Sequence, residues 1–172
     1  YLEHLEKTGV STNVASFVGA TTVRVHEVGY DNREPSPEEL DRMRALVDQA
    51  MREGALGVGS SLPYTPAVFA STEELVALAE VAAKHGGMYI SHVRDEGGQL
   101  LESLDEFLEI VRRSGASGEV YHLKASGKAN WHKGDLAIAK LEQARAAGLR
   151  VTADIYPYPA SSTGLTYALP PW

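Results

Sequence analysis

Apolar and polar positions follow two alternating periods along most of the chain. Short runs rich in Val, Ile and Tyr, which suit strands, are followed by longer stretches where apolar residues recur every three to four positions, as on one face of a helix. The predicted strands cover residues 11–18, 57–62, 88–93, 119–124 and 150–156. The predicted helices cover residues 37–53, 72–85, 100–114 and 136–147.

Sequence signals mark the helix boundaries. Ser36 and Ser71 each precede a helix and have glutamate three positions later, which is the capping-box pattern, and proline follows Ser36 at the first helical position. Asp135 is the predicted cap of the last helix, and residues 21–33 predict a loop or a short helix. The last four strands begin about 31 residues apart, the length of one strand plus one helix. This regular alternation predicts a parallel sheet covered by helices.

The strand count leaves two architectures open. Five strands form either a complete open sheet or five-eighths of a (β/α)₈ barrel. Alternation along the strands puts His92 and Arg94 on one face, His122 and Lys124 on the same face of the next strand, and Tyr156 on that face of the last one. Because three successive strands direct polar groups to one place, we predict an α/β fold that is a partial (β/α)₈ TIM barrel. Residues 1–172 would form a single segment of it, incomplete at both ends.

Composition narrows the classes of partner. The net charge of −7 argues against nucleic acid or an anionic membrane as the main partner. The chain has no cysteine, which excludes disulfides and thiolate metal ligands and fits a cytoplasmic protein. No apolar run is long enough to span a bilayer, and no signal peptide is visible.

Two histidines are candidate metal ligands. His92 and His122 lie at the carboxyl ends of adjacent predicted strands, and adjacent strands are about 4.8 Å apart. Two imidazoles placed there could hold one Zn²⁺ ion. Two ligands do not complete a tetrahedral site, so two unrelated, hydrogen-bonded histidines remain the alternative.

Two cations are candidate ligands for an anionic substrate group. Lys124 and Arg94 lie on the predicted lumen face. Either side chain could instead form a salt bridge at the rim with Asp95, Glu96 or Asp154.

Two hydroxyl groups are further candidates for substrate contacts. Tyr156 could donate to a substrate oxygen, or it could pack against the prolines that follow it. Ser162 lies in a predicted loop, where a turn-forming role is the alternative.

Taken together, these motifs resemble the N-acyl-D-amino-acid deacylases (D-aminoacylases) of the amidohydrolase superfamily. The resemblance implies a zinc-dependent (β/α)₈ barrel, of which this chain supplies strands three to seven. It also implies hydrolysis of the amide bond of N-acyl-D-amino acids to a carboxylate and a free D-amino acid. The matching stretches run in family order: NVASFVG at 13–19, GALG at 54–57, SHVRDEG at 91–97, HLK at 122–124, DIYPY at 154–158, SST at 161–163 and LPPW at 169–172.

The resemblance also implies roles for individual residues. His92 and His122 match zinc ligands, Lys124 and Tyr156 match residues that contact the substrate carboxylate and the reacting carbonyl region, and Ser162 matches a substrate-contacting serine. The family's His-x-His pair, bridging cysteine and catalytic aspartate have no counterpart here. We therefore expect no catalytic residue in this segment, one or two zinc ions in the full-length protein, and no activity from the segment alone.

The expected partners are a small N-acyl amino acid and the remainder of the same barrel, and a homo-oligomer stays open. One alternative is a dihydroorotase-like or hydantoinase-like enzyme. Those enzymes usually carry a carboxylated lysine on strand four, where this chain has GVGSSL at 57–62. The other alternative is a non-catalytic βα domain that binds a small anion through Arg94 and Lys124. Such a domain should carry no stoichiometric zinc.

Overall fold

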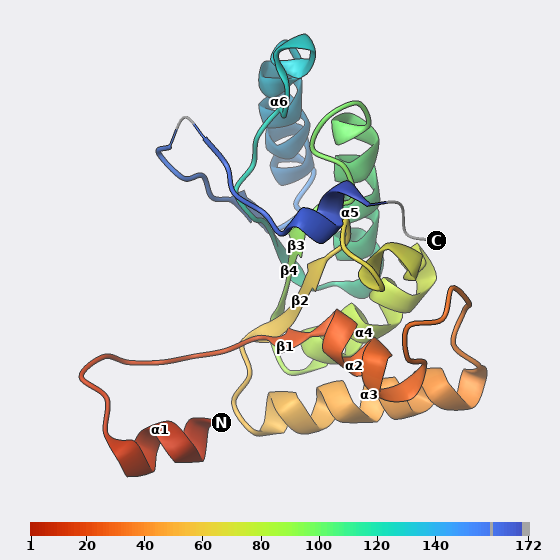
Figure 1. Ribbon diagram of the computed structural model, residues 1–172, viewed down its shortest axis with the longest axis vertical. Helices are drawn as coiled ribbons and strands as arrows, with labels where there is room; N and C mark the ends of the chain where they lie inside the picture. The colour runs from red at the N-terminus through yellow and green to blue at the C-terminus, as the bar shows by residue number, and fades with distance from the viewer. Residues whose placement is uncertain (159, 170–172) are drawn as a thin grey trace.

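Five parallel strands form one sheet in the order β1-β2-β3-β4-β5 (Figure 1). The computed structural model describes residues 1–158 and 160–169. The strands are β1 Val18–Gly19, β2 Gly57–Ser61, β3 Met88–His92, β4 Ser117–Val120 and β5 Val151–Ala153. Strand order thus follows chain order throughout, as it does around a (β/α)₈ barrel.

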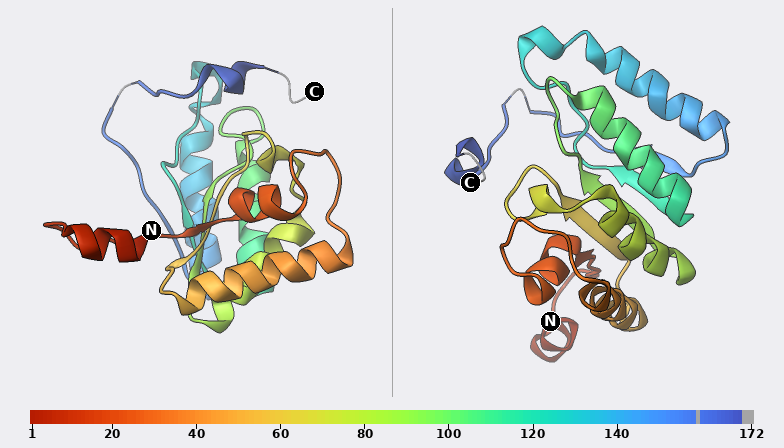
Figure 2. Two further views of the ribbon diagram at one scale, coloured as in Figure 1. Left: turned by 60° about the horizontal axis from the view of Figure 1, so that its bottom comes forward. Right: turned by 90° about the vertical axis from the view of Figure 1, so that its right-hand side faces the viewer.

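Helices connect the strands and cover one face of the sheet. Consecutive helices from α3 to α6 pack side by side along that face (Figure 2). This arrangement confirms the predicted partial barrel. None of the helices in the described part of the chain is long and apolar enough to cross a membrane. The helices are α1 Leu2–Thr8, α2 Ala20–Glu27, α3 Pro37–Arg52, α4 Thr72–Lys84, α5 Leu100–Ser114 and α6 Lys133–Ala146, with short 3₁₀ turns η1 Ala67–Phe69, η2 Lys128–Asn130 and η3 Leu165–Ala168.

The predicted capping box is complete at Ser36 and only half formed at Ser71. The capping box of Ser36 is complete, since its hydroxyl accepts the Glu39 N–H and the Glu39 carboxylate accepts the Ser36 N–H. Ser71 likewise accepts the N–H of Glu74. The Glu74 carboxylate, however, pairs with the buried guanidinium of Arg24, which also donates to two carbonyls of the loop after α2. This ion pair fixes α2 against α4.

The apolar core lies between the sheet and its helices. Tyr89 of β3 stacks on Phe107 of α5 with ring centroids 5.9 Å apart, and its hydroxyl lies 2.7 Å from the Ser60 hydroxyl. A Cβ atom at Gly118 would lie 2.4 Å from the Val111 side chain, so β4 can approach α5 closely only with glycine there. Gly118 and Tyr89 therefore face the helices, which leaves the opposite face of the sheet for the site.

Several predicted boundaries are wrong. Strand β1 has two residues instead of the predicted 11–18, β4 ends at Val120 rather than running over 119–124, and β5 ends at Ala153 instead of continuing to Tyr156. Among the described residues β1 and β5 each pair with one neighbour only, so their ladders are short. Helix α6 begins at Lys133, before the predicted cap Asp135.

Candidate active site

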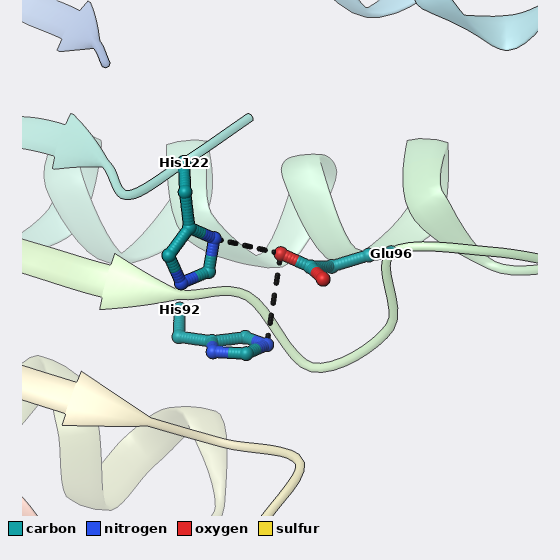
Figure 3. Close-up of side chains that lie close together, drawn as sticks. All are labelled: His92, Glu96 and His122. Carbon is teal, nitrogen blue, oxygen red and sulfur yellow. Dashed lines mark ion pairs between the residues drawn. The ribbon is translucent and has the colours of Figure 1, made fainter. Parts of the chain in front are cut away.

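Two imidazoles meet at the carboxyl ends of β3 and β4. His92 is the last residue of β3, and His122 follows β4 by two residues. Their ring centroids are 4.4 Å apart and the ring planes are nearly perpendicular, at 87°. Figure 3 shows both rings beside the carboxylate of Glu96. The structure therefore brings the two predicted metal ligands together.

The backbone of His122 explains how its ring reaches this place. Gly118 and Val120 face the helices, so simple alternation would turn His122 toward the helices as well. Instead the strand stops at Val120, and His122 has a positive φ of 38°, which is uncommon for residues other than glycine. Its N–H donates to Asp154 Oδ1 at 2.6 Å, which stabilises this conformation. The predicted position of His122 is correct, but the predicted strand register that led to it is wrong.

A folded loop after β3 carries Glu96 into the site. The carboxylate of Asp95 accepts the backbone N–H of Gly97, which closes a tight turn around Glu96. The carbonyl of Glu96 accepts the N–H of Ser126 at 2.7 Å, so this loop is tied to the loop after β4.

Glu96 completes a cluster of three metal-ligating groups. Its Oε1 lies 3.0 Å from His122 Nδ1 and 3.6 Å from His92 Nε2 (Figure 3). The three donor atoms lie within 4.8 Å of one another. Imidazole nitrogen and carboxylate oxygen are both ligands that Zn²⁺ takes, so the donor set fits three positions of a tetrahedral site. From the sequence Glu96 is expected only as a salt-bridge partner, although its place in the charged run after the His92 strand is a signal for a ligand.

The ammonium group of Lys124 lies within the same cluster. It donates to Glu96 Oε1, to His122 Nδ1 at 2.7 Å and to the His122 carbonyl at 2.9 Å. It also lies 5.4 Å from the ring centroid of Tyr156. The salt bridge with Glu96 that the sequence left open is therefore formed, and Lys124 contacts one of the two predicted metal ligands, His122, directly.

The environment of His92 favours a neutral ring. Burial lowers the pKa of His92 below its ordinary value, the neighbouring His122 and Lys124 also lower it, and the Glu96 carboxylate opposes them. The neutral imidazole is the form that binds a metal ion.

A cavity of about 360 Å³ adjoins the cluster. Tyr156 lines it, and its ring centroid is 6.1 Å from that of His122. Ser162 is exposed, and its neighbour Ser161 contributes to the cavity wall. Substrate contacts by Tyr156 and Ser162 stay predictions. The cavity is lined by His122, Lys124, Trp131, Tyr156, Tyr158 and Ser161, among others.

The predicted placement of Arg94 beside His92 is wrong. Strand β3 ends at His92, so alternation does not extend to Arg94, and its guanidinium turns toward α5. There it binds both carboxylate oxygens of Glu106, each at 2.8 Å, and two carbonyls of the loop after β2. This pairing with Glu106 raises the pKa of Arg94 above its ordinary value. Arg94 is thus engaged by the protein itself.

Comparison with known proteins identifies relatives over almost the whole chain, although no family model matches it. An N-acyl-D-glutamate deacylase of Alcaligenes xylosoxydans xylosoxydans is 38% identical over 163 residues, which are 95% of this chain and 33% of that protein. A D-aminoacylase of the same organism is 34% identical over 165 residues, 96% of this chain and 34% of that protein. The chain is homologous to the D-aminoacylases.

Solved structures of D-aminoacylases agree in fold. The crystal structure of an N-acyl-D-glutamate deacylase from Bordetella bronchiseptica, complexed with zinc and a phosphonate inhibitor that mimics the tetrahedral intermediate, superposes with a TM-score of 0.87 at 32% identity. It is matched over 91% of this chain and 33% of that one. A D-aminoacylase described as defining a novel subset of amidohydrolases also has a TM-score of 0.87, at 35% identity, over 92% of this chain and 33% of that one.

The chain therefore spans about one third of the length of its relatives. These matches confirm the resemblance to the D-aminoacylases that the motifs indicated. Of the last matching stretch, residues 170–172 lie outside the described residues.

Proposed function

We propose that this chain is part of a cytoplasmic, metal-dependent deacylase that hydrolyses the amide bond of N-acyl-D-amino acids to a carboxylate and a free D-amino acid. The observation that carries the proposal is the cluster of His92, Glu96 and His122, with Lys124 beside it, at the carboxyl ends of the strands. In (β/α)₈ enzymes the active site lies at this end of the barrel. The names of the homologous deacylases support the same chemistry.

The residues of the cluster fit a zinc site. His92 and His122 would bind the ion, and Glu96 offers a third donor. When bound, zinc polarises the acyl carbonyl and lowers the pKa of a water molecule. One D-aminoacylase relative is described as having a binuclear metal centre, so this protein would hold one or two ions. The remaining ligands and the general-base aspartate would come from strands outside this segment.

The other residues of the site would bind and orient the substrate. Lys124 would pair with the α-carboxylate of the N-acyl amino acid, because its ammonium borders both the cluster and the cavity. Tyr156 would orient the scissile amide from the far side of Lys124. Ser162 would contact the substrate from the loop after β5.

The structure gives no support to the two alternatives. Strand β2 has no lysine that could be carboxylated, in contrast to dihydroorotase-like enzymes. A domain that binds a small anion through Arg94 and Lys124 needs both cations at one site, whereas the guanidinium of Arg94 turns away from Lys124 to pair with Glu106 of α5.

The proposed function is tested on the intact protein that carries this segment. With stoichiometric zinc, it should release free amino acid from N-acetyl-D-amino acids and show little release from the L-enantiomers. Removal of the metal by a chelator should abolish the activity, and added zinc should restore it. A zinc-loaded protein that hydrolyses none of a panel of acidic, apolar and polar N-acetyl-D-amino acids would refute the proposal.

We further propose that a following βα unit covers the edge of this segment. An apolar groove of about 360 Å³ runs between β5 and α6, lined in part by Leu123, Leu141 and Val151. At its rim, Ile138 and Ile155 are 52% and 76% exposed. Strand β5 has one described neighbour, so its other backbone edge can pair with a further strand. In a complete barrel, the next strand would pair with the open edge of β5 and the next helix would cover the apolar groove.

The 172-residue segment alone should therefore self-associate through this edge. Sedimentation velocity at increasing concentration should show oligomers, because exposed apolar grooves and open strand edges promote association. Changing Ile138 and Ile155 together to glutamate should shift the segment toward monomer. Tyr30→Glu, at a site 68% exposed and distant in sequence, is the matched control and should change nothing. A wild-type segment that stays monomeric at every concentration would contradict the incomplete barrel.

A further inference from the structure

Arg94 bridges the loop after β2 and helix α5. Its Nη1 donates to the Val68 carbonyl at 3.0 Å, and its Nη2 donates to the Ala70 carbonyl at 2.9 Å. Its Nε and Nη2 hold the two carboxylate oxygens of Glu106. Glu106 is itself fixed by Thr72 at the start of α4, whose hydroxyl donates to it at 2.9 Å. Arg94 thus fastens the end of this loop to two helices.

The same loop leads directly back to the metal cluster. The N–H of Val68 donates to the carbonyl of Tyr64 at 2.9 Å. The carbonyl of the same Val68 accepts from Arg94, so Val68 links Arg94 to Tyr64. The ring of Tyr64 packs edge-on against His92, with centroids 5.5 Å apart at an angle of 85°. Its hydroxyl lies 2.8 Å from Thr163 Oγ1 in the loop after β5. Tyr64 therefore contacts both the ligand histidine and the loop that carries Ser162.

We propose that Arg94 is a positioning residue that acts through Tyr64: it holds the loop after β2 so that Tyr64 fixes the orientation of the His92 ring. This inference rests on the proposed function, in which His92 is a metal ligand. His92 has His122 on one side and Tyr64 on another, and no hydrogen bond from its own side chain is formed in the described part of the chain. Aromatic packing on two sides of the ring, with the Glu96 carboxylate 3.6 Å from its Nε2, then sets the direction of its nitrogens.

Holding the loop after β2 against α5 requires the planar guanidinium group of arginine. Four hydrogen bonds from Arg94 reach three partners in two places, Glu106 of α5 and the carbonyls of Val68 and Ala70 in the loop after β2. A lysine keeps the positive charge but offers one nitrogen, which cannot reach the carboxylate and both carbonyls together. Arg94→Lys should therefore release the loop while leaving the charge balance of the region unchanged.

The test uses the intact protein and three variants: Arg94→Lys, Tyr64→Leu and the double variant. Arg94→Lys should speed hydrogen exchange of the amides in residues 63–70, because the carbonyls of Val68 and Ala70 lose the guanidinium that donates to them. Its kcat/KM and its zinc affinity should fall roughly ten- to a hundred-fold, as for the loss of an outer partner of a metal ligand. The double variant should be no worse than Tyr64→Leu, because Arg94 acts through Tyr64.

Arg113→Lys is the matched control. Arg113 makes a two-pronged pair with Glu73 that also joins α5 to α4, but it is exposed and does not touch the loop after β2. A change that merely loosens the contact between these helices would lower the melting temperature in both arginine variants and leave kcat/KM and zinc affinity unaffected.

The possible outcomes separate the proposals. Unchanged exchange in residues 63–70, unchanged kcat/KM, or losses that add up in the double variant would each overturn the role of Arg94. An intact protein that binds zinc but hydrolyses no N-acyl-D-amino acid refutes the proposed function, and the zinc affinities of the same variants then decide the role of Arg94. A wild-type protein that binds no zinc refutes both.

Discussion

Replacing His122 by asparagine in the intact protein should lower kcat/KM for N-acyl-D-amino acids about 1,000-fold or more and reduce its zinc content. Metal polarisation of a carbonyl contributes several kcal/mol to transition-state stabilisation, and each ~1.4 kcal/mol corresponds to a tenfold change in rate. Asparagine places only a neutral amide group near the position of His122 Nδ1, 3.0 Å from Glu96 Oε1, and Zn²⁺ binds imidazole nitrogen, thiolate and carboxylate rather than an amide. His92→Asn should have an effect of similar size, since the two rings face one point.

His132→Asn is the matched control for these variants. His132 is exposed and lies in the loop that leads into α6, close in sequence to the site but outside the cluster of donor atoms. Metal analysis and steady-state kinetics on all three proteins decide the question. Retention of stoichiometric zinc together with wild-type kcat/KM in His122→Asn would exclude this cluster as the metal site. Equal losses in His132→Asn would point to a general defect in folding.

The sequence predicted the central part of the fold well because local and tertiary preferences agree there. Strands β2 and β3 and the helices α3, α4 and α5 lie close to their predicted ranges, since capping serines, terminal glycines and the apolar period all mark the same boundaries. At the edges this agreement is missing. Strand β1 has two residues, and in the described part of the chain it pairs with β2 alone.

The site was predicted less completely because backbone geometry, rather than residue type, decides where its side chains lie. Alternation placed Arg94 beside His92, but the strand ends at His92 and the chain then turns. The positive φ of His122 has no sequence signal of the kind that glycine or asparagine would give. Tyr64 packs against His92 with ring centroids 5.5 Å apart. It was missed because no sequence pattern relates a tyrosine in a predicted loop to a histidine 28 positions later.

Lys124→Met should lower kcat/KM of the intact protein roughly ten- to a hundred-fold, about 1.4–2.7 kcal/mol, as expected for loss of a charge-assisted hydrogen bond. The proposed substrate has a free α-carboxylate, and burying it without a cation is unfavourable. Lys124 lies 2.7 Å from a predicted metal ligand and on the wall of the adjoining cavity, so a carboxylate bound to it places the amide next to the cluster. Methionine keeps most of the unbranched side chain and removes the ammonium group with its charge and hydrogen bonds.

Comparing charged and neutral substrates distinguishes carboxylate binding by Lys124 from a purely structural role of this residue. The wild-type protein should prefer an N-acetyl-D-amino acid over the corresponding neutral N-acetyl-D-amino amide, and Lys124→Met should lose that preference. Lys128→Met, which removes an exposed cation from η2 near the same loop, should keep it. Loss of zinc from Lys124→Met would mean that the ammonium serves mainly to hold Glu96 and His122 in place. If wild type and Lys124→Met favour the free acid equally, with zinc unchanged, the carboxylate binds elsewhere and Lys124 is only the partner of Glu96.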